Sequence, residues 1–376
     1  MTLRVAQVHC LVDNQNLAPD DLLRGLPSLT LVAKAAAEAG AEIHVIQSSR
    51  RAEVHQANGV TYRFVPEMCL GDRTTGLMPW RLSAEIRRLN PDVVHFHGLE
   101  HPLHLRAVCA TNAPVLVQDH ASRPRPSRAA VRHWSLARAA ACAFTSATQA
   151  EPFARAGELP RHLEVLEIPE SSSLFTPGDR DGARQESGVF GDPALLWIGH
   201  LDSNKDPLTI LKAVRLALET LPDLHLWCAY ASGELLSECE ALLKQDQLLA
   251  RQVHLLGRVS HAHVEVLCRA CDIFVLGSHR EGSGYALIEA LACGLAPVVS
   301  DIPSFRALTG NGSVGILVPI GNVEGFAAGI VAQARAVNDG SRTRVLRNFE
   351  RHLSPAALGR RLVDAYEHVA ASGKLR

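Results

Sequence analysis

The 376-residue sequence has no apolar run close to the about 18 residues that a membrane-spanning helix needs. Its start, MTLRVAQVHC, also lacks the charged segment and the apolar stretch of a secretory signal. These two absences predict a cytoplasmic protein without a transmembrane helix.

The sequence also lacks an excess of charge, since 38 Lys and Arg residues are matched by 39 Asp and Glu residues. A net charge of −1 makes nucleic acid an unexpected partner. No internal repeat or low-complexity tract is present. A hydrophobic content of 47% is typical of a globular protein, and the length suits two domains better than one core.

Disulfide and metal signals are scarce as well. The nine cysteines are an odd number and mostly lie within apolar runs, as reduced buried thiols do. Cys268 and Cys271 have metal-ligand spacing, but no second pair follows, so buried thiols are favoured over a zinc site. A group of histidines would formally permit a metal, but groups arise easily among 18 histidines, and we expect none; the group is His95, His97, His101 and His104.

The sequence does contain alternating strand and helix patterns, which are typical of parallel α/β sheets. In the first half the predicted strands are 3–8, 42–46, 92–96, 115–117 and 163–168, with a helix over 28–39. In the second half they are 194–198, 224–228, 254–256, 272–276 and 297–300, with a final helix over about 355–372.

The alternation stops at Pro169, and residues 170–188 are rich in Ser, Gly, Pro and charged residues, which marks a domain boundary. We expect two doubly wound domains that face a cleft. Their limits are 1–178 for the first domain, 179–189 for a linker, 190–354 for the second domain and 355–376 for a last helix. In such sheets, ligands bind beyond the carboxyl ends of the strands.

The most informative segment is SHREGSGYALIEALACGLAPVV, residues 278–299, which directly follows a predicted strand. Gly282 and Gly284 allow a ligand to approach the backbone, and the free N–H groups of a helix that starts at Tyr285 favour an anion. Leu287 stands where a dinucleotide-binding loop would have its third glycine, and the segment is not a Walker A loop either.

Two carboxylates, Glu281 and Glu289, bracket this helix start. A carboxylate repels phosphate but accepts hydrogen bonds from hydroxyls, so a diphosphate flanked by two polyols, as in a nucleotide sugar, fits the segment. The spacing of the two glutamates, the strand, loop and helix around them, and the following ACGLAPVV resemble the retaining glycosyltransferases of family 4, which have the GT-B fold. In proteins of that family the final helix crosses back to the first domain, so the resemblance implies the same for the helix at 355–372.

This resemblance implies a role for each matching residue of the second domain. Glu281 would bind the donor sugar, with Gly282 and Ser283 beside it, and Glu289 would bind the ribose hydroxyls. Lys205, in LLWIGHLDSNKDPL, would neutralise the leaving diphosphate, although an exposed lysine before a helix is the simpler alternative. The remaining predicted contacts are the amides of Gly284, Tyr285 and Ala286 to the diphosphate, and Gly257, Arg258 and Val259 to the base.

The chain departs from the family pattern at several positions. His200 replaces the usual arginine and has no bidentate fork for phosphate. Ser283 replaces an apolar residue, and Gly25, expected in the loop before the first helix to approach the donor phosphates, replaces a glycine pair. The sequence ESSS at 170–173 replaces the usual Asn-Gly-Val-Asp. The resemblance is specific over 194–335 and looser before it.

The first domain is expected to bind the acceptor. His120, in PVLVQDHAS, matches a family position at which a histidine contacts the sugar or assists acid–base chemistry, while a capping or packing role is the alternative. Asp179-x-Asp181 resembles the metal motif of the other glycosyltransferase fold but lies in the expected linker, so we discount it.

A basic segment runs through this domain, because no acid occurs between Asp119 and Glu151. It contains Arg123, Arg125, Arg128, Arg132 and Arg138. The segment is either a solvated helix face or a contact for an acceptor phosphate or a membrane surface, which would place the protein weakly at the inner face of a membrane.

The sequence thus predicts a retaining, metal-independent glycosyltransferase without a cofactor. It would move a sugar from a nucleotide-diphosphate sugar to a glycan, lipid-linked or small-molecule acceptor, with His120, Lys205 and Glu281 as catalytic residues. An alternative is a nucleotide-sugar-binding, weakly active or inactive subunit of a polysaccharide assembly system, and a third is a nucleotide-sugar epimerase.

Overall fold

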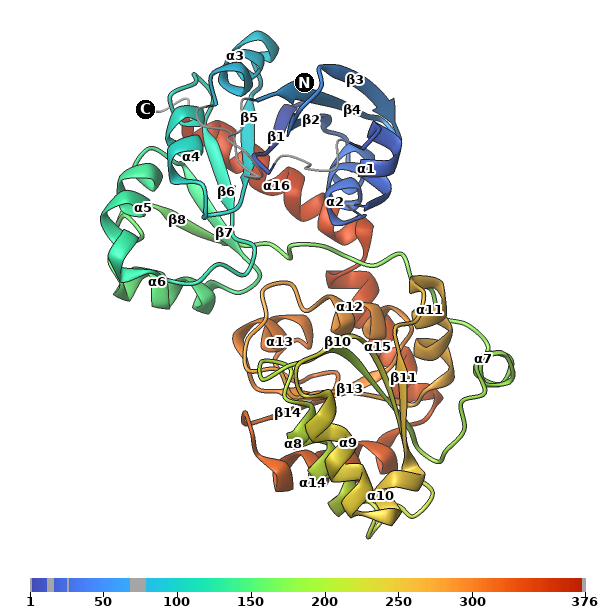
Figure 1. Ribbon diagram of the computed structural model, residues 1–376. Coiled ribbons are helices and arrows are strands. Elements are labelled where there is room, and N and C mark those ends of the chain that lie inside the picture. Colours follow the sequence, from blue (N-terminus) through green and yellow to red (C-terminus); the bar gives the residue numbers. More distant parts are fainter. Residues whose placement is uncertain (1, 12–16, 26, 68–78, 374–376) are drawn as a thin grey trace. The chain divides into compact units, whose positions relative to one another are not determined.

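The computed structural model describes residues 2–11, 17–25, 27–67 and 79–373 (Figure 1). The chain divides into two compact units, one from Met1–Ser172 together with Pro355–Arg376 and one from Ser173–Ser354. Each unit is built on its own sheet, mainly parallel in the first unit and parallel in the second, with helices around it, which confirms the predicted pair of doubly wound α/β domains.

The described residues of the first unit form an eight-stranded sheet in the order β3-β4-β2-β1-β5-β6-β7-β8. Its strands are β1 (Arg4–His9), β2 (Glu42–Ser49), β3 (Glu53–Ala57), β4 (Val60–Pro66), β5 (Val93–His97), β6 (Val115–Gln118), β7 (Ala141–Phe144) and β8 (Glu164–Glu167). Its helices are α1 (Pro19–Gly25), α2 (Pro27–Glu38), α3 (Trp80–Leu89), α4 (Pro102–Val108), η1 (Pro126–Arg128), α5 (Ala129–Leu136), η2 (Ala147–Ala150), α6 (Glu151–Arg155) and α16 (Pro355–Gly373). Successive residues of β1 point to opposite faces, so that Val5 joins one core and Ala6 the other.

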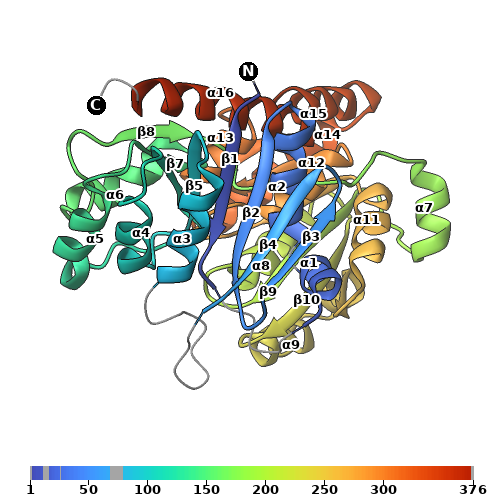
Figure 2. The ribbon, with the colours of Figure 1, turned by 90° about the horizontal axis from the view of Figure 1, so that it is seen from above.

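One part of this sheet was not predicted from the sequence. β3 and β4 form an antiparallel hairpin, and Figure 2 shows β1, β2, β4 and β3 side by side. Asn58 and Gly59 connect the two strands with φ values of 52° and 75°. Positive φ at both residues is what a two-residue turn of type I′ requires, and Asn-Gly is the usual sequence signal for it.

The C-terminal helix α16 belongs to the first unit and packs along α2 (Figure 1). Gly359 makes this close approach feasible, since a Cβ at this position would collide with the backbone of Ala35. Leu358, Leu362 and Tyr366 are buried in the same core as Val5. The last helix therefore completes the core of the first unit.

The described residues of the second unit form a six-stranded parallel sheet in the order β11-β10-β9-β12-β13-β14. Its strands are β9 (Ala194–Leu201), β10 (His225–Gly233), β11 (Val253–Gly257), β12 (Ile273–Leu276), β13 (Ala296–Ser300) and β14 (Ile316–Val318). Its helices are α7 (Arg180–Ser187), α8 (Pro207–Ala217), α9 (Leu236–Gln245), α10 (Gln247–Gln252), α11 (His261–Ala270), α12 (Tyr285–Ala292), α13 (Pro303–Leu308), α14 (Val323–Ala336) and α15 (Asp339–His352). The strand order reverses between β9 and β12, and ligands of such sheets bind at this position.

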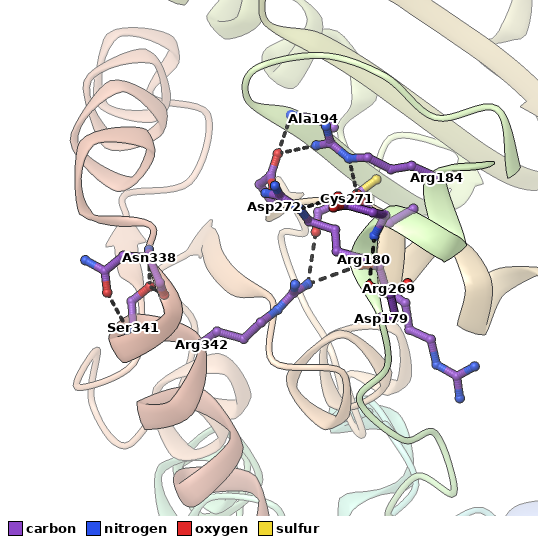
Figure 3. Close-up of polar contacts among 12 residues, drawn as sticks. Asp179, Arg180, Arg184, Ala194, Arg269, Cys271, Asp272, Asn338, Ser341 and Arg342 are labelled. Carbon is purple, nitrogen blue, oxygen red and sulfur yellow. Dashed lines mark hydrogen bonds and ion pairs between the residues drawn. The ribbon is translucent and has the colours of Figure 1, made fainter. Parts of the chain in front are cut away.

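The segment 179–189, which we expected to be a linker, instead forms α7 and belongs to the second unit. Asp179 caps the helix by accepting hydrogen bonds from the backbone of the first turn. Arg180 and Arg184 both donate to Asp272 at 2.8 Å, and Asp272 also accepts from the amide of Ala194 at 2.8 Å (Figure 3). A polar, charge-rich sequence suggested a loop, but ion pairs to a distant buried carboxylate order it as a helix.

No helix among the described residues is both long and apolar enough to cross a membrane. The eight described cysteines are buried free thiols, including Cys268 and Cys271. Cys69 lies outside the described residues.

Candidate active site

The loops that follow β9 and β12 meet at the reversal point of the second sheet. The amide of His279 donates to the carbonyl of Asn204 at 2.7 Å, and the side-chain amide of Asn204 donates to the carbonyl of Arg280 at 3.0 Å. His279 Nε2 also lies 3.1 Å from Asp206 Oδ2. Gly277 lets the two loops approach, because a Cβ there would lie 3.1 Å from the carbonyl of Asp206.

These contacts bring Lys205 and Glu281 together. The Lys205 ammonium donates to Glu281 Oε1, which also accepts from the hydroxyl of Ser278 at 2.7 Å. The side chains are 18% and 12% exposed, respectively. The stem of Lys205 lies against Gly199, where a Cβ would be 3.3 Å from Lys205 Cγ. The pair unites two residues that we predicted separately, one for the diphosphate and one for the sugar.

The helix α12 begins at Tyr285, a few residues after Glu281. Gly284 caps it in the left-handed conformation with a φ of +66°, and a Cβ there would lie 2.8 Å from Leu308 Cδ1. Glycine therefore suits this position for two reasons: it adopts the left-handed conformation easily, and no side chain would fit in the space. Tyr285 is 40% exposed and Ala286 is half-buried. The N-terminus of α12 presents the positive end of the helix dipole, which favours an anion.

Glu289 lies one turn further along α12, and its Oε1 is 2.6 Å from Nε2 of His261, the first residue of α11. Burial raises the pKa of the Glu289 carboxyl above its ordinary value, and the hydrogen bond and charge of His261 offset only part of that rise. A carboxylate can accept hydrogen bonds from sugar hydroxyls, which is the role predicted for Glu289.

The predicted base loop follows β11. Gly257 has a φ of +70°, and no atom lies within 4 Å of the position that its Cβ would take. Arg258 donates to the carbonyl of Ala231 at 3.1 Å, while Val259 packs against the core. The loop leads into Ser260, which caps α11.

Three further predicted residues lie at the end of β9 and in the loop before α12. His200 is exposed near the end of β9, and its carbonyl accepts from the amide of Asp202 at 2.8 Å. Gly282 is buried and Ser283 half-buried in the loop between Glu281 and α12.

In the first unit, both ring nitrogens of His120 have protein partners. Nδ1 is 3.1 Å from Glu170 Oε2, and Nε2 is 2.9 Å from Nδ1 of His97. The ring of His97 stacks on that of His9 and is tilted by 34° against that of His95, with ring centroids 4.1 Å apart in both pairs. His120 is thus one end of a histidine cluster, defined here as His9, His95, His97 and His120.

The buried members of the histidine cluster have depressed pKa values. Burial lowers the pKa of His95 to about 3. Burial, with repulsion from the other imidazoles, lowers the pKa of His9 and of His97 well below the ordinary range. His95 Nδ1 lies 2.8 Å from the hydroxyl of Tyr366 on α16, which also accepts from Gln7 at 3.1 Å. These rings therefore pack as neutral groups.

The basic segment is divided between buried and exposed arginines. Arg132 is buried and forms ion pairs with Glu158 and Glu100, so its charge is compensated within the protein. The exposed members are Arg123, Arg125, Arg128 and Arg138. Gly25, which we expected in a loop, is instead the last residue of the short helix α1. In the part of the chain described, no group of three or more His, Cys, Asp or Glu side chains is arranged to hold a metal ion.

Two family models match the chain. Residues 28–167 match "Glycosyltransferase Family 4" and residues 179–344 match "Glycosyl transferases group 1". The chain belongs to the family 4 glycosyltransferases. Each model matches the region of one of the two sheets. The "Glycosyl transferases group 1" match, residues 179–344, contains Lys205, Glu281 and Glu289.

Curated relatives of this glycosyltransferase include a D-inositol 3-phosphate glycosyltransferase of Geodermatophilus obscurus, 33% identical over 47% of this chain and 41% of that protein. A GDP-mannose:cellobiosyl-diphosphopolyprenol alpha-mannosyltransferase of Xanthomonas campestris is 26% identical over 84% of this chain and 82% of that protein. Among solved structures, Anabaena HepE in complex with UDP and glucose superposes with a TM-score of 0.66 at 15% identity, covering 97% of this chain and 100% of that one. This last similarity shows that the glycosyltransferase has the GT-B fold.

Sequence reasoning missed several residues that build the sites of this glycosyltransferase. Asn204 and His279 tie together the loops that follow β9 and β12, and Glu170 contacts His120. Asn204 and His279 follow the ends of predicted strands, where site residues are expected, so strand ends were the available signal. Nothing in the local sequence pointed from Glu170 to His120, which is 50 residues away.

Proposed function

We propose that this glycosyltransferase transfers the sugar of a nucleotide-diphosphate sugar with retention of configuration and without a metal ion, to an acceptor bound mainly by the first unit. The observation that carries the proposal is the Lys205–Glu281 ion pair beside the N-terminus of α12. It combines a cation for a leaving diphosphate, a carboxylate for sugar hydroxyls and a helix start for phosphate oxygens.

In the proposed reaction, the bond between the anomeric carbon and the diphosphate oxygen breaks, and a bond from that carbon to the acceptor oxygen forms on the same face. The proton of the acceptor hydroxyl passes to the departing phosphate oxygen. Lys205 and the amides of Gly284, Tyr285 and Ala286 stabilise the negative charge that develops there. Glu281 holds the sugar, and no protein nucleophile takes part.

Metal independence is proposed because the second unit offers positive charge of its own. Lys205 supplies a full charge, and the dipole of α12 supplies a partial charge at its first turn. His200 replaces the guanidinium of the family pattern, so we expect diphosphate to bind with fewer charge-assisted hydrogen bonds than in enzymes with arginine.

For the acceptor, we propose a phosphorylated or lipid-linked saccharide. The names of the two curated relatives contain inositol 3-phosphate and a diphosphopolyprenol. The exposed arginines of the basic segment would attract such phosphate groups, and Trp134 and Val131, each 45% exposed on α5, would suit weak contact with a membrane surface.

The test is a thermal-shift panel of UDP, GDP, ADP, dTDP and their sugars, followed by transfer assays with the best donor. A ligand at about 100 times its Kd should raise stability by roughly 2.7 kcal/mol. Wild type should respond to one base, Glu289→Ala less, and the product should keep the anomeric configuration of the donor in excess EDTA. An inverted product or loss of turnover with EDTA would overturn the corresponding part of the proposal.

The variant His200→Arg tests the alternative that the protein binds a nucleotide-sugar donor but does not transfer the sugar. A transferase limited by weak diphosphate contacts should gain both affinity and turnover from the added guanidinium. A gain of affinity with no turnover in either protein would instead indicate a binding subunit.

A further inference from the structure

Glu289 has a partner that places a second side chain in the donor site. His261 Nε2 lies 2.6 Å from Glu289 Oε1. The histidine side chain is 70% exposed, whereas the glutamate side chain is 15% exposed. His261 is the first residue of α11, and only Ser260 separates it from the predicted base loop, which ends at Val259. It therefore lies between that loop and the carboxylate expected to bind ribose.

A second contact restrains the ring of His261. The ring of Phe175 lies 4.7 Å from it, centroid to centroid, at an interplanar angle of 39°. Phe175 is itself buried, and its amide donates to the hydroxyl of Ser173 at 3.0 Å. The imidazole is thus held by an aromatic ring and by a hydrogen bond despite its exposure, which an unconstrained surface histidine would not be.

The surroundings of Glu289 give this contact an electrostatic consequence. Burial raises the pKa of the carboxyl, and His261 acts in the opposite direction. Two further titratable groups lie nearby, the thiols of Cys268 on α11 and Cys293 after α12. A hydrogen bond with Cys293, together with burial, raises the pKa of Cys268, so this thiol stays neutral. His261 therefore helps to keep Glu289 ionised.

We propose that His261 is a positioning residue for the nucleotide, which donates to Oε1 of Glu289 and leaves Oε2 to accept from the vicinal hydroxyls of a ribose. The inference rests on the proposed function, because it assigns Glu289 to the nucleotide donor. A carboxylate offers about four acceptor positions, so one hydrogen bond from His261 leaves enough for a diol. Fixing the carboxylate in advance reduces the ordering that binding requires.

The ligand class follows from this geometry. The contribution of His261 reaches the ligand through Glu289, and hence through the sugar hydroxyls of the nucleoside. It should not depend on the base. It should depend on the 2′-hydroxyl, so a nucleoside diphosphate with ribose should benefit and its 2′-deoxy counterpart should not.

The experiment measures Kd by calorimetry for UDP, GDP and their 2′-deoxy forms on the full chain. The variants are His261→Leu, which cannot donate, and His261→Gln, which can. His263→Leu is the matched control, being the same residue type half-buried on the same helix. For the ribonucleotide that wild type binds, we expect His261→Leu to raise Kd about 10-fold, as loss of an orienting partner typically does. His261→Gln should recover most of the loss, and His263→Leu should match wild type.

With the 2′-deoxy form, wild type and His261→Leu should bind alike. Equal losses for both forms would show a merely structural role, and tighter binding by His261→Leu would show that His261 competes with the ribose; either result overturns the inference. His261→Ala provides a second test should the leucine variant fail to fold. Failure of wild type to bind any nucleotide would overturn the proposed function itself, whereas normal binding by wild type and His261→Leu alike would overturn the role of His261 alone.

Discussion

Nδ1 of His120 lies 3.1 Å from Oε2 of Glu170, so these two residues form a histidine–carboxylate pair in the first unit. An ionised carboxylate only accepts hydrogen bonds, which places a proton on Nδ1. The other ring nitrogen, Nε2, lies 2.9 Å from Nδ1 of His97. Glu170 thereby selects the tautomer of His120.

The first prediction concerns this pair. Glu170→Leu should lower kcat about 10- to 100-fold with little change in the KM for the nucleotide sugar, because the orientation of His120 is lost while the donor site is untouched. Glu170→Gln keeps an acceptor oxygen and should lose less. Glu151→Gln, at an exposed glutamate, is the control. Steady-state kinetics that show equal kcat in all four proteins would contradict the assignment.

The second prediction concerns the ion pair of the donor site. Lys205→Ala should lower kcat by about 10²- to 10³-fold, since a charge aimed at the leaving diphosphate is removed. Lys212→Ala, at an exposed lysine on the adjoining helix α8, should leave kcat unchanged. Transfer assays with saturating donor distinguish the two variants. A higher KM with an unchanged kcat would mean that Lys205 binds the ground state and the transition state equally.

The third prediction concerns the ion pairs that hold α7. Asp272 is 6% exposed, and Asp272→Ala would leave two guanidiniums and the amide of Ala194 without their acceptor (Figure 3). We expect a loss of about 3 kcal/mol in the free energy of unfolding, at the low end for a buried pair because the side chain of Arg180 is 45% exposed. Asp181→Ala, whose ion pair with Arg180 is at the surface, should cost under about 1 kcal/mol. Urea unfolding monitored by circular dichroism measures both.

The fourth prediction concerns the effect of the histidine cluster on stability at acidic pH. Its buried histidines have folded-state pKa values below the 6.5 of the unfolded chain, about 3 in the case of His95. The unfolded state therefore binds protons that the folded state cannot, and stability falls as pH drops below about 6.5. Each such histidine should contribute about 1.4 kcal/mol per pH unit.

The variant His9→Phe tests the sign and size of this effect. Phenylalanine keeps an aromatic ring stacked on His97 but does not titrate. Between pH 7 and pH 5, the loss of unfolding free energy should be about 2 kcal/mol smaller in His9→Phe than in wild type. A loss that is equal in both proteins would mean that His9 is already protonated in the fold.

Much of the fold could be predicted because strands and helices have different periods. The buried runs at β1, β9 and β12 gave correct strands, and Gly284 before Tyr285 gave the correct start of α12. The errors came where a local signal and a tertiary contact disagree. The segment at Arg180 has a loop-like composition, yet it is a helix because Asp272 pairs with it.

For the proposed donor site, the sequence predicted the residues that lie close together in the chain but not the side-chain contacts between distant residues. Glu281, Gly284 and Glu289 lie within one strand, loop and helix, so their spacing alone places them at a helix start. His261 and Glu170 act through side chains that are distant in sequence, and no period or local motif relates them to Glu289 and His120.

The sequence by itself determined the alternating strands and helices and the start of α12, since hydrophobic period and backbone hydrogen bonding depend on neighbouring residues. Tertiary structure alone decided that Lys205 meets Glu281, 76 residues away. This outcome follows from strand order. Parallel pairing of β9 with β12 brings the ends of strands that are not consecutive in the chain to one edge, and no stretch of consecutive residues specifies that pairing.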